Sequence, residues 1–390
     1  MDDICLSNQS CPMIENAEDY REHPKIALFL PDLGMGGAER VFVTLSKYLA
    51  QMGYQVDLVL AKKDGPLLKE VAPEVNVVDL AVSRSGESGW LFGLRTLFSL
   101  RLYLRSFPPD IMLSTLTGAN LTVLVARLIS LRKFRLVIRE AATLANVKSG
   151  LRLRLMRFLY PLADKVVVLT EFMKDEMVKS LRLPIEKIAV IGNPVDGERI
   201  RLLAADSDAG QIVDKVTPFA VVVGRLVEQK DFFTAIHAVA RVNDERPLNL
   251  VVIGDGPQKE ELLALARTLN INERVYCLGF QPNPYPWINQ ADVFILSSKW
   301  EGYPNVLLEA MSLGRPIVST EYDASIGVIL SVYPERRYRV VSVGNGMEMA
   351  NAVLELTGRD DMAENGGINN IRQVVDKYLS AFKVGNPRQI

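Results

Sequence analysis

Ala291-Asp-Val-Phe-Ile-Leu-Ser-Ser-Lys-Trp-Glu-Gly-Tyr-Pro-Asn-Val-Leu-Leu-Glu-Ala-Met311 is the segment that constrains the fold most strongly. Its apolar first half is typical of a buried strand ending near Ser297, and its second half has the spacing of a helix starting near Pro304. One carboxylate, Glu301, lies in the loop, and another, Glu309, lies in the otherwise apolar helix. Because an unpartnered carboxylate there is costly, we predict that Glu309 binds a ligand such as a ribose diol. The alternative is an ion pair with a core arginine.

The loop after Glu301 leads directly into the predicted helix. Free amides at a helix N-terminus, together with the helix dipole, favour a phosphate or another anion. We therefore expect backbone contacts to an anionic ligand along this segment, which consists of Gly302, Tyr303, Pro304, Asn305 and Val306.

The remainder of the chain repeats the alternation of strand and helix. Two blocks of it, separated by a polar stretch, predict an α/β protein with two Rossmann-like parallel-sheet domains and an active site in the cleft between them. Helical patterns lie between the strands, and one at 38–52 ends at Gly53. The predicted strands are Lys25–Pro31, Gln55–Ala61, Val75–Leu80, Asp110–Thr115, Arg135–Arg139, Lys165–Thr170, Ile188–Ile191, Pro218–Gly224, Asn249–Gly254, Arg274–Gly279, Asp292–Ser297 and Pro316–Ser319.

The same alternation sets the expected domain boundaries. They are a polar tail at 1–24, a first domain at 25–192, a linker at 193–217, a second domain at 218–365, and a C-terminal helix and tail at 366–390 that packs back on the first domain.

Two cations follow the first strand of the second block. Arg225 comes directly after Gly224, and Lys230 follows five residues later. Ligands of parallel sheets bind beyond the strand C-termini, so we expect this pair to clamp a diphosphate, with Arg225 binding bidentately. The alternative is a solvated helix start paired with Glu228.

Glycine turns follow two further strands. Gly36 and Gly37 precede a helix, and Gly254 precedes another, so backbone could approach a phosphate or nucleotide there. Purely structural tight turns are the alternative. The first turn is not a dinucleotide fingerprint, because Glu39 stands where that motif needs its third glycine.

Composition narrows the class of protein. The 390 residues carry a net charge of −1, which argues against a general nucleic-acid binder. Three scattered cysteines are too few for a disulfide scaffold or a zinc site. Residues 1–22 lack the pattern of a signal peptide, and the apolar window at 113–131 is interrupted, so no transmembrane helix is expected.

Charge is distributed unevenly along the chain. The block Arg95–Lys165 contains thirteen Lys and Arg but three Asp and Glu, interleaved with apolar residues. This pattern favours docking on an anionic membrane surface. The alternative is a set of ordinary helices whose arginine stems cover apolar surface.

Taken in order, the motifs resemble those of retaining glycosyltransferases of family 4, which have the two-domain GT-B fold. The resemblance covers about residues 25–360 and is most specific in the Glu-x7-Glu segment. The motifs that carry it are Gly36-Gly-Ala-Glu-Arg40, Gly224-Arg-x4-Lys230, Gly254-Asp-Gly-Pro257, Leu278-Gly-Phe280 and Glu301-x7-Glu309.

The resemblance implies roles for the two domains and their residues. The second domain would bind a nucleotide-sugar donor, with contacts that include Phe280, and the first domain would bind the acceptor. Arg225 and Lys230 would neutralise the diphosphate without a metal or other cofactor. Glu309 would bind the ribose. Glu301 would orient the donor sugar and stabilise an oxocarbenium-like transition state.

The chain departs from this family in two places. Neither histidine fits the N-terminal-domain histidine that many relatives have near the donor sugar. The matching strand end, Val137–Asn146, is similar to that of polysaccharide-building members, which makes Arg139 and Glu140 the acceptor-side candidates. The turn Ala324–Leu330 lacks the usual Gly-Pro-x-Glu, which puts donor-sugar contacts there in doubt and makes a weakened enzyme conceivable.

The expected protein is a cytoplasmic glycosyltransferase, a hexosyl- or N-acetylhexosaminyltransferase, peripheral on the inner face of the cytoplasmic membrane. It would transfer a sugar from a UDP- or GDP-sugar to a lipid-linked or growing saccharide in surface polysaccharide biosynthesis. One alternative is a nucleotide-sugar epimerase or hydrolase of the same fold, and another is a degenerate transferase that serves as an assembly partner.

Overall fold

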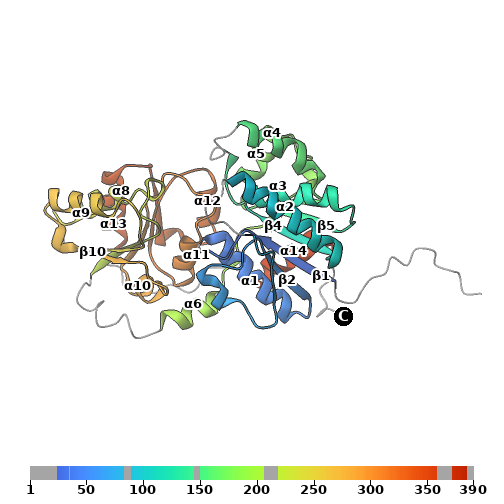
Figure 1. Ribbon diagram of the computed structural model, residues 1–390. Coiled ribbons are helices and arrows are strands. Elements are labelled where there is room, and N and C mark those ends of the chain that lie inside the picture. The colour runs from blue at the N-terminus through green and yellow to red at the C-terminus, as the bar shows by residue number, and fades with distance from the viewer. Residues whose placement is uncertain are drawn as a thin grey trace, which may run out of the picture.

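The computed structural model describes residues 24–34, 36–82, 89–144, 150–205, 218–357 and 371–383. Two lobes lie side by side, and each is built around one parallel sheet (Figure 1). The α/β class and the two-domain arrangement expected from the sequence are therefore confirmed.

The first sheet has seven strands in the order β3-β2-β1-β4-β5-β6-β7, all parallel. The order reverses direction between β1 and β4, which opens a crevice at the carboxyl ends of these two strands. Its strands are β1 (Lys25–Leu30), β2 (Gln55–Leu60), β3 (Asn76–Asp79), β4 (Ile111–Thr115), β5 (Arg135–Arg139), β6 (Lys165–Val168) and β7 (Ile188–Val190).

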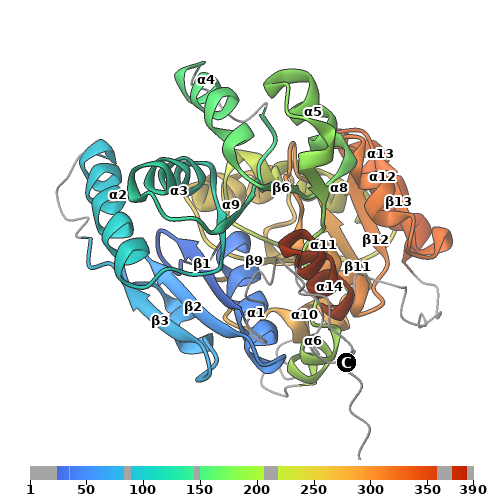
Figure 2. The ribbon, with the colours of Figure 1, turned by 90° about the vertical axis from the view of Figure 1, so that its right-hand side faces the viewer.

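Helices cover both faces of this sheet. One core lies between the sheet and helices α1 and α14, and the other lies between the opposite face and helices α2 to α5. Figure 2 shows α2, α3, α4 and α5 on one side of the strands and α1 with α14 on the other. These helices are α1 (Gly37–Gln51), α2 (Gly89–Ser106), α3 (Thr117–Ser130), α4 (Gly150–Leu159), α5 (Glu171–Leu181) and α14 (Ile371–Phe382), with single turns η1 (Pro66–Glu70), η3 (Tyr160–Leu162) and η4 (Ile185–Lys187).

Helix α1 illustrates how the sequence determines a local boundary. Its apolar side, which includes Phe42, Leu45 and Leu49, is fully buried against the sheet. Gly53 follows the helix with a φ of 95°, a conformation that favours glycine. The predicted helix stop at this glycine is confirmed.

The second sheet has six strands in the order β10-β9-β8-β11-β12-β13, and its order reverses between β8 and β11. Helices α8, α9 and α13 cover one face, while α10, α11 and α12 contribute to the core on the other. Its elements are β8 (Phe219–Val223), η6 (Glu228–Lys230), α8 (Phe232–Val242), β9 (Asn249–Ile253), α9 (Lys259–Thr268), η7 (Asn272–Arg274), β10 (Val275–Gly279), α10 (Tyr285–Gln290), β11 (Val293–Leu296), α11 (Asn305–Ser312), β12 (Ile317–Thr320), α12 (Ser325–Leu330), η8 (Glu335–Arg337), β13 (Tyr338–Val341) and α13 (Gly346–Leu356).

One strand was not expected from the sequence. β13 is four residues long and pairs with β12 at the edge of the sheet. Its residues Tyr338 and Arg339 lack the apolar run of a central strand, because an edge strand is only partly buried. Pairing with β12, rather than local pattern, makes this segment a strand.

Two helices connect the lobes. Helix α6 (Gly197–Ala204) lies within the segment expected to be a linker and packs against α10 and α11. Helix α14 follows the second domain in sequence but packs on the first, where Arg135 donates to the carbonyl oxygen of Ala381. Residues 206–217 of the expected linker lie outside the described residues, as do the tails at 1–23 and 384–390 and the segment 358–370.

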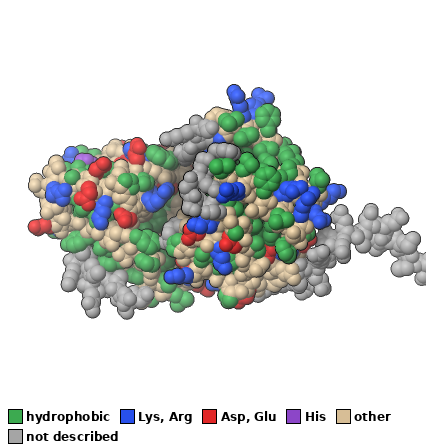
Figure 3. Space-filling view, in the orientation of Figure 1, with side chains coloured by type: hydrophobic (Ala, Val, Ile, Leu, Met, Phe, Trp, Pro, Cys, Tyr) green, Lys and Arg blue, Asp and Glu red, His purple; other side chains and the backbone are tan. Residues whose placement is uncertain are grey.

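Basic and apolar side chains gather on the outer surface of the first domain. Figure 3 shows Lys and Arg interspersed with hydrophobic side chains over the lobe that carries α2, α3 and α4, whereas the other lobe mixes both charge signs. We call this surface the basic–apolar face. Its exposed residues include Arg105, Arg132, Lys133, Arg154, Arg157, Phe98, Leu102, Leu128, Leu131, Leu151, Leu155 and Phe158.

Candidate active site

The predicted site residues follow strands next to the reversal points of the two sheets. Arg225 and Lys230 follow β8, and Glu301 follows β11, the two strands that flank the reversal in the second sheet. In the first sheet, Gly36 and Gly37 follow β1. Ligands of doubly wound sheets bind at such points, so strand order alone brings these distant segments together.

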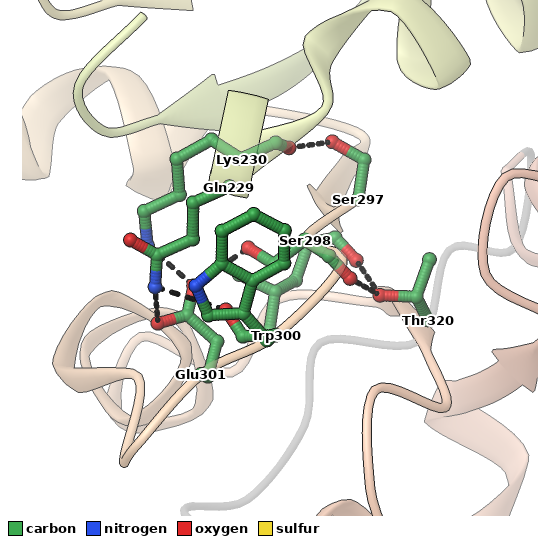
Figure 4. Close-up of polar contacts among 8 residues, drawn as sticks. Gln229, Lys230, Ser297, Ser298, Trp300, Glu301 and Thr320 are labelled. Carbon is green, nitrogen blue, oxygen red and sulfur yellow. Dashed lines mark hydrogen bonds and ion pairs between the residues drawn. The ribbon is translucent and has the colours of Figure 1, made fainter. Parts of the chain in front are cut away.

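Glu301 is the centre of a polar cluster in the second domain (Figure 4). Its side chain is buried, and its Oε1 atom lies 2.5 Å from the Nζ atom of Lys230. The hydroxyl of Ser298 donates to the same oxygen at 2.6 Å, and the amide of Gln229 donates to Oε2 at 3.5 Å. The two strand-end segments predicted to bind a donor are therefore in direct contact through Lys230 and Glu301.

Arg225 occupies a different position from Lys230. Its side chain is exposed at the end of β8, although it lies close enough to Glu39 of α1 to affect the titration of that residue. Burial raises the pKa of Glu39 and nearby Asp32 raises it further, whereas Arg139 and Arg225 lower it. Arg225 is thus exposed at the strand end and lies within electrostatic range of the first-domain helix α1.

The glycine turns of the second domain stack against one another. Gly254 has a φ of 136°, and a Cβ atom there would lie 1.9 Å from the carbonyl oxygen of Gly224. A Cβ at Gly256 would lie 2.5 Å from the carbonyl oxygen of Leu226. These glycines are required for close packing of the strand-end loops. The turn at Gly254 therefore has the structural role that the sequence analysis gave as the alternative, whether or not it also contacts a ligand. Phe280, at the end of β10, is exposed.

The first glycine turn meets the Glu-x7-Glu segment across the cleft. A Cβ at Gly37 would lie 2.8 Å from the Nδ2 atom of Asn305, which donates to the carbonyl oxygen of Gly37 at 3.3 Å. A Cβ at Gly302 would lie 2.1 Å from the carbonyl oxygen of Ala141. Tyr303 packs against cores of both domains. Glycine at these positions allows the two domains to approach closely.

Glu309 lines a cavity of about 40 Å³ between the domains, together with Arg40, Tyr285 and Asn305. Burial of its carboxyl group raises its pKa, whereas Arg40 and a hydrogen bond from Tyr285 lower it. The alternative role expected for Glu309 from the sequence is an ion pair with a core arginine. The effect of Arg40 on the Glu309 pKa partly fits that alternative, but Arg40 belongs to the opposite domain. The Glu309 side chain is partly buried, and Pro304, which precedes the first residue of α11, is itself buried.

Arg139 is almost completely buried. A residue that contacts the acceptor directly would instead be exposed to the cleft. Its guanidinium donates to Thr115 at 2.9 Å and to Asn193 at 2.5 Å, while its Nε atom has no partner. Asn193 in turn donates to Asn305 at 2.5 Å. Arg139 is therefore joined through Asn193 to the first turn of α11 in the other domain.

Glu140 is also buried, on the opposite face of the sheet. It accepts hydrogen bonds from Tyr160 at 2.6 Å and from Thr117 at 3.2 Å. Burial raises its pKa, and these bonds and the amides of Ala141 and Ala142 lower it. Arg139 and Glu140 thus lie behind the surface of the cleft, and the backbone of Ala141 is what meets Gly302.

The unusual turn after β12 forms the short helix α12. Ser325 is buried and donates to Asp323, so these residues stabilise the turn in the absence of the glycine and proline expected from the resemblance. The hydroxyl of Tyr322 is buried without a hydrogen-bond partner, and burial raises its pKa well above its usual range.

Several residues of the cluster were not predicted from the sequence. Ser298, Gln229 and Thr320 contact Glu301 or each other, and Asn193 links the domains. The sequence contained one signal for Ser298, which is its position three residues before Glu301 at a strand end. Gln229 had a similar signal, since it directly precedes Lys230, whereas Thr320 and Asn193 come from distant segments and had none.

Two features are absent from the described ranges. Within them, no group of three or more His, Cys, Asp or Glu side chains is arranged to hold a metal ion. No helix in that part of the chain is long and apolar enough to cross a membrane.

Two family models match the chain, one for each domain. The model described as Glycosyltransferase Family 4 matches residues 35–199, and the model described as Glycosyl transferases group 1 matches residues 217–359.

Curated relatives match most of the chain. The N-acetylgalactosamine-N,N'-diacetylbacillosaminyl-diphospho-undecaprenol 4-alpha-N-acetylgalactosaminyltransferase of Campylobacter jejuni is 32% identical over 309 residues, which cover 77% of this chain and 81% of that enzyme. The amylovoran biosynthesis glycosyltransferase AmsD of Erwinia amylovora is 26% identical over 75% of this chain and 78% of its own.

Solved structures share the fold at lower identity. The apo form of the lipopolysaccharide outer core galactosyltransferase WaaB has a TM-score of 0.70 at 20% identity, covering 92% of this chain and 99% of its own. HepE of Anabaena in complex with UDP-glucose has a TM-score of 0.75 at 19% identity, covering 92% and 100%.

Proposed function

The chain belongs to the glycosyltransferases of the GT-B fold, and from this premise we propose that it is a retaining enzyme acting on a lipid-linked or growing saccharide. The donor is a UDP- or GDP-sugar, and the product contributes to a surface polysaccharide or glycan. The Lys230–Glu301 contact at the reversal point of the second sheet, opposite the glycine turn, is the observation that carries this proposal. The names of the Campylobacter and Erwinia relatives support the substrate class.

The proposed chemistry depends on charge placed around the donor. Arg225 and Lys230 stabilise the diphosphate as the bond from the anomeric carbon to its oxygen breaks. The acceptor hydroxyl attacks from the same face and forms the new glycosidic bond, while a phosphate oxygen takes its proton. Glu301 stabilises positive charge on the sugar, and Glu309 binds the ribose. The two cations supply the charge for which other transferases use a metal.

The acceptor lies on the first-domain side of the cleft. The Ala141 backbone, which meets Gly302, forms part of that wall. Arg139 and Glu140 act on the acceptor side by fixing the strand end that leads into this wall, since both are anchored by hydrogen bonds within the domain.

The basic–apolar face provides the contact with the membrane. Exposed Phe158 and Leu151 lie on the same helix as Arg154 and Arg157, which suits insertion among anionic headgroups. An acceptor attached to a lipid would be presented at this surface. We therefore place the enzyme on the inner face of the cytoplasmic membrane.

Calorimetry tests the donor site. The protein is titrated with UDP, GDP, ADP and UDP-sugars in the presence of EDTA, beside Arg225→Ala and Glu309→Ala. We expect one nucleotide to bind with micromolar affinity without metal and both variants to lose at least tenfold in affinity, because each removes a charged contact. Arg241→Ala, an exposed cation of α8 far from the cleft loops, is the matched control and should bind normally.

The alternatives give different results. Absence of binding for every nucleotide would favour a non-enzymatic assembly partner. Release of free sugar at full rate without an acceptor would favour a hydrolase or epimerase.

A further inference from the structure

Lys230 has two roles that compete for the same ammonium group. In this structure it pairs with the buried carboxylate of Glu301 at 2.5 Å. In the proposed reaction it also engages the donor diphosphate. A buried carboxylate that loses its cation is strongly destabilised and free to move unless other donors hold it, so some other group must fix Glu301 when Lys230 turns to the donor.

Ser298 is the residue that meets this need. Its hydroxyl donates to the same oxygen of Glu301 at 2.6 Å, a length typical of a charge-assisted hydrogen bond. Gln229 is the other donor, but its contact at 3.5 Å is at the limit for a hydrogen bond.

Ser298 is itself held from behind. It is fully buried, and its carbonyl oxygen accepts from the hydroxyl of Thr320 at 2.6 Å. Thr320 is also fully buried and lies at the end of the adjacent strand β12. Figure 4 shows Ser298 lying between Thr320 and Glu301, with Lys230 and Gln229 on the other side of the Glu301 carboxylate.

A second set of bonds ties the two strand-end loops together. The hydroxyl of Ser297 donates to the carbonyl oxygen of Lys230 at 2.7 Å, and the backbone of Lys299 donates to that of Gln229 at 2.8 Å. The backbone of Lys230 is thus fixed while its side chain remains able to move between two anions.

We propose that Ser298, supported by Thr320, is the positioning residue that keeps the Glu301 carboxylate in place when Lys230 engages the donor diphosphate. This inference rests on the proposed function. It predicts that Ser298 matters for turnover rather than for donor binding, because Lys230 and Arg225 remain intact without it.

The test is steady-state kinetics of the full-length Ser298→Ala variant with the donor nucleotide-sugar and acceptor that the wild type uses. We expect kcat to fall about 10- to 100-fold, the value of a hydrogen bond to a charged group. Donor KM and the calorimetric affinity for the free nucleoside diphosphate should stay within about twofold, since the phosphate clamp is retained. Ser298→Cys keeps a weak hydrogen-bond donor, so its kcat should lie between those of the wild type and Ser298→Ala.

The matched control is Ser46→Ala. Ser46 is equally buried but donates only to the backbone of α1 at Val43. It should leave kcat unchanged. If Ser298→Ala fails to fold in a thermal unfolding assay, Ser298→Cys carries the comparison.

Thr320→Val provides an independent check because it keeps the side-chain shape. It should lower kcat less than Ser298→Ala, and the double variant should be no worse than Ser298→Ala alone, since both act through one group. Full additivity, or wild-type kcat in Ser298→Ala, overturns the inference. A wild type that binds no nucleotide and transfers no sugar instead refutes the proposed function.

Discussion

Glu309 shows how a single residue of the cleft combines a cost to the fold with the ribose-binding role that we propose for it. Its carboxyl group is placed in an apolar helix, and burial raises its pKa above the ordinary value of 4.5 despite Arg40 and Tyr285 nearby. A position selected for stability alone would not hold a charge there. The ribose hydroxyls of the proposed donor are groups that would offset this cost.

This residue gives a prediction for stability against pH. A carboxyl group with a raised folded pKa contributes stability while it is protonated, and this contribution is lost as pH rises through the folded value. Glu309→Gln should therefore raise the melting temperature at pH 7, by on the order of 1–3 °C, and the gain should disappear below pH 4.5. Thermal unfolding followed by circular dichroism across this pH range measures it.

Glu261→Gln is the control, because that side chain is exposed on α9. It should change the melting temperature little at either pH. A lower melting temperature for Glu309→Gln at pH 7 would show that the charged form is needed for the fold.

At the scale of elements, helices α2, α3 and α4 differ from the helices of the second domain. They cover their sheet with one side and expose leucine, phenylalanine and arginine on the other. Exposed apolar patches of this kind mark interaction surfaces, and the surplus of cations is the reason for proposing an anionic membrane surface as the partner.

Charge reversal tests whether that partner is a membrane. Arg154→Glu with Arg157→Glu should weaken binding to vesicles containing anionic lipid by at least tenfold, because each basic residue near such a surface contributes about 1 kcal/mol. Co-sedimentation with vesicles measures it, and affinity for the nucleotide should not change.

The equivalent reversal in the other lobe, Arg241→Glu with Arg267→Glu, changes net charge by the same amount. It should leave vesicle binding intact. Equal loss in both pairs would mean that net charge alone, and not the basic–apolar face, governs the interaction.

At the scale of the whole molecule, the two domains are also held together by contacts outside the polar cluster around Glu301. Tyr48 of α1 donates to Asp196 at 2.9 Å, and Arg199 of α6 pairs with Glu70 at 2.8 Å. Since α6 packs on the second domain, these bonds tie the two domains to each other.

Removal of both contacts should open the cleft. Tyr48→Phe with Glu70→Gln removes partly exposed interactions worth about 1–2 kcal/mol together. We expect a larger radius of gyration in small-angle X-ray scattering and a loss of nucleotide affinity of up to about tenfold, because fewer molecules are competent to bind. Glu171→Gln, which breaks a surface pair within α5, should change neither quantity.

Some features of the site follow from local sequence. The pairing of glycine turns with strand ends, and the positions of Arg225, Lys230 and Glu301 beyond buried strands, could be predicted because apolar runs and glycines act over a few residues. β13 could not, since its residues form a strand only by pairing with β12.

Sequence by itself determined the class of fold, twelve of the strands, and the position of Arg225, Lys230 and Glu301 just after buried strands. Tertiary structure alone decided which of these residues meet. Ser298 and Thr320 are 22 positions apart, and Asn193 and Asn305 are 112 apart. The physical reason is that a hydrogen bond depends on the placement of two atoms to within a few tenths of an ångström, and strand order and domain closure set that placement for residues far apart in the chain.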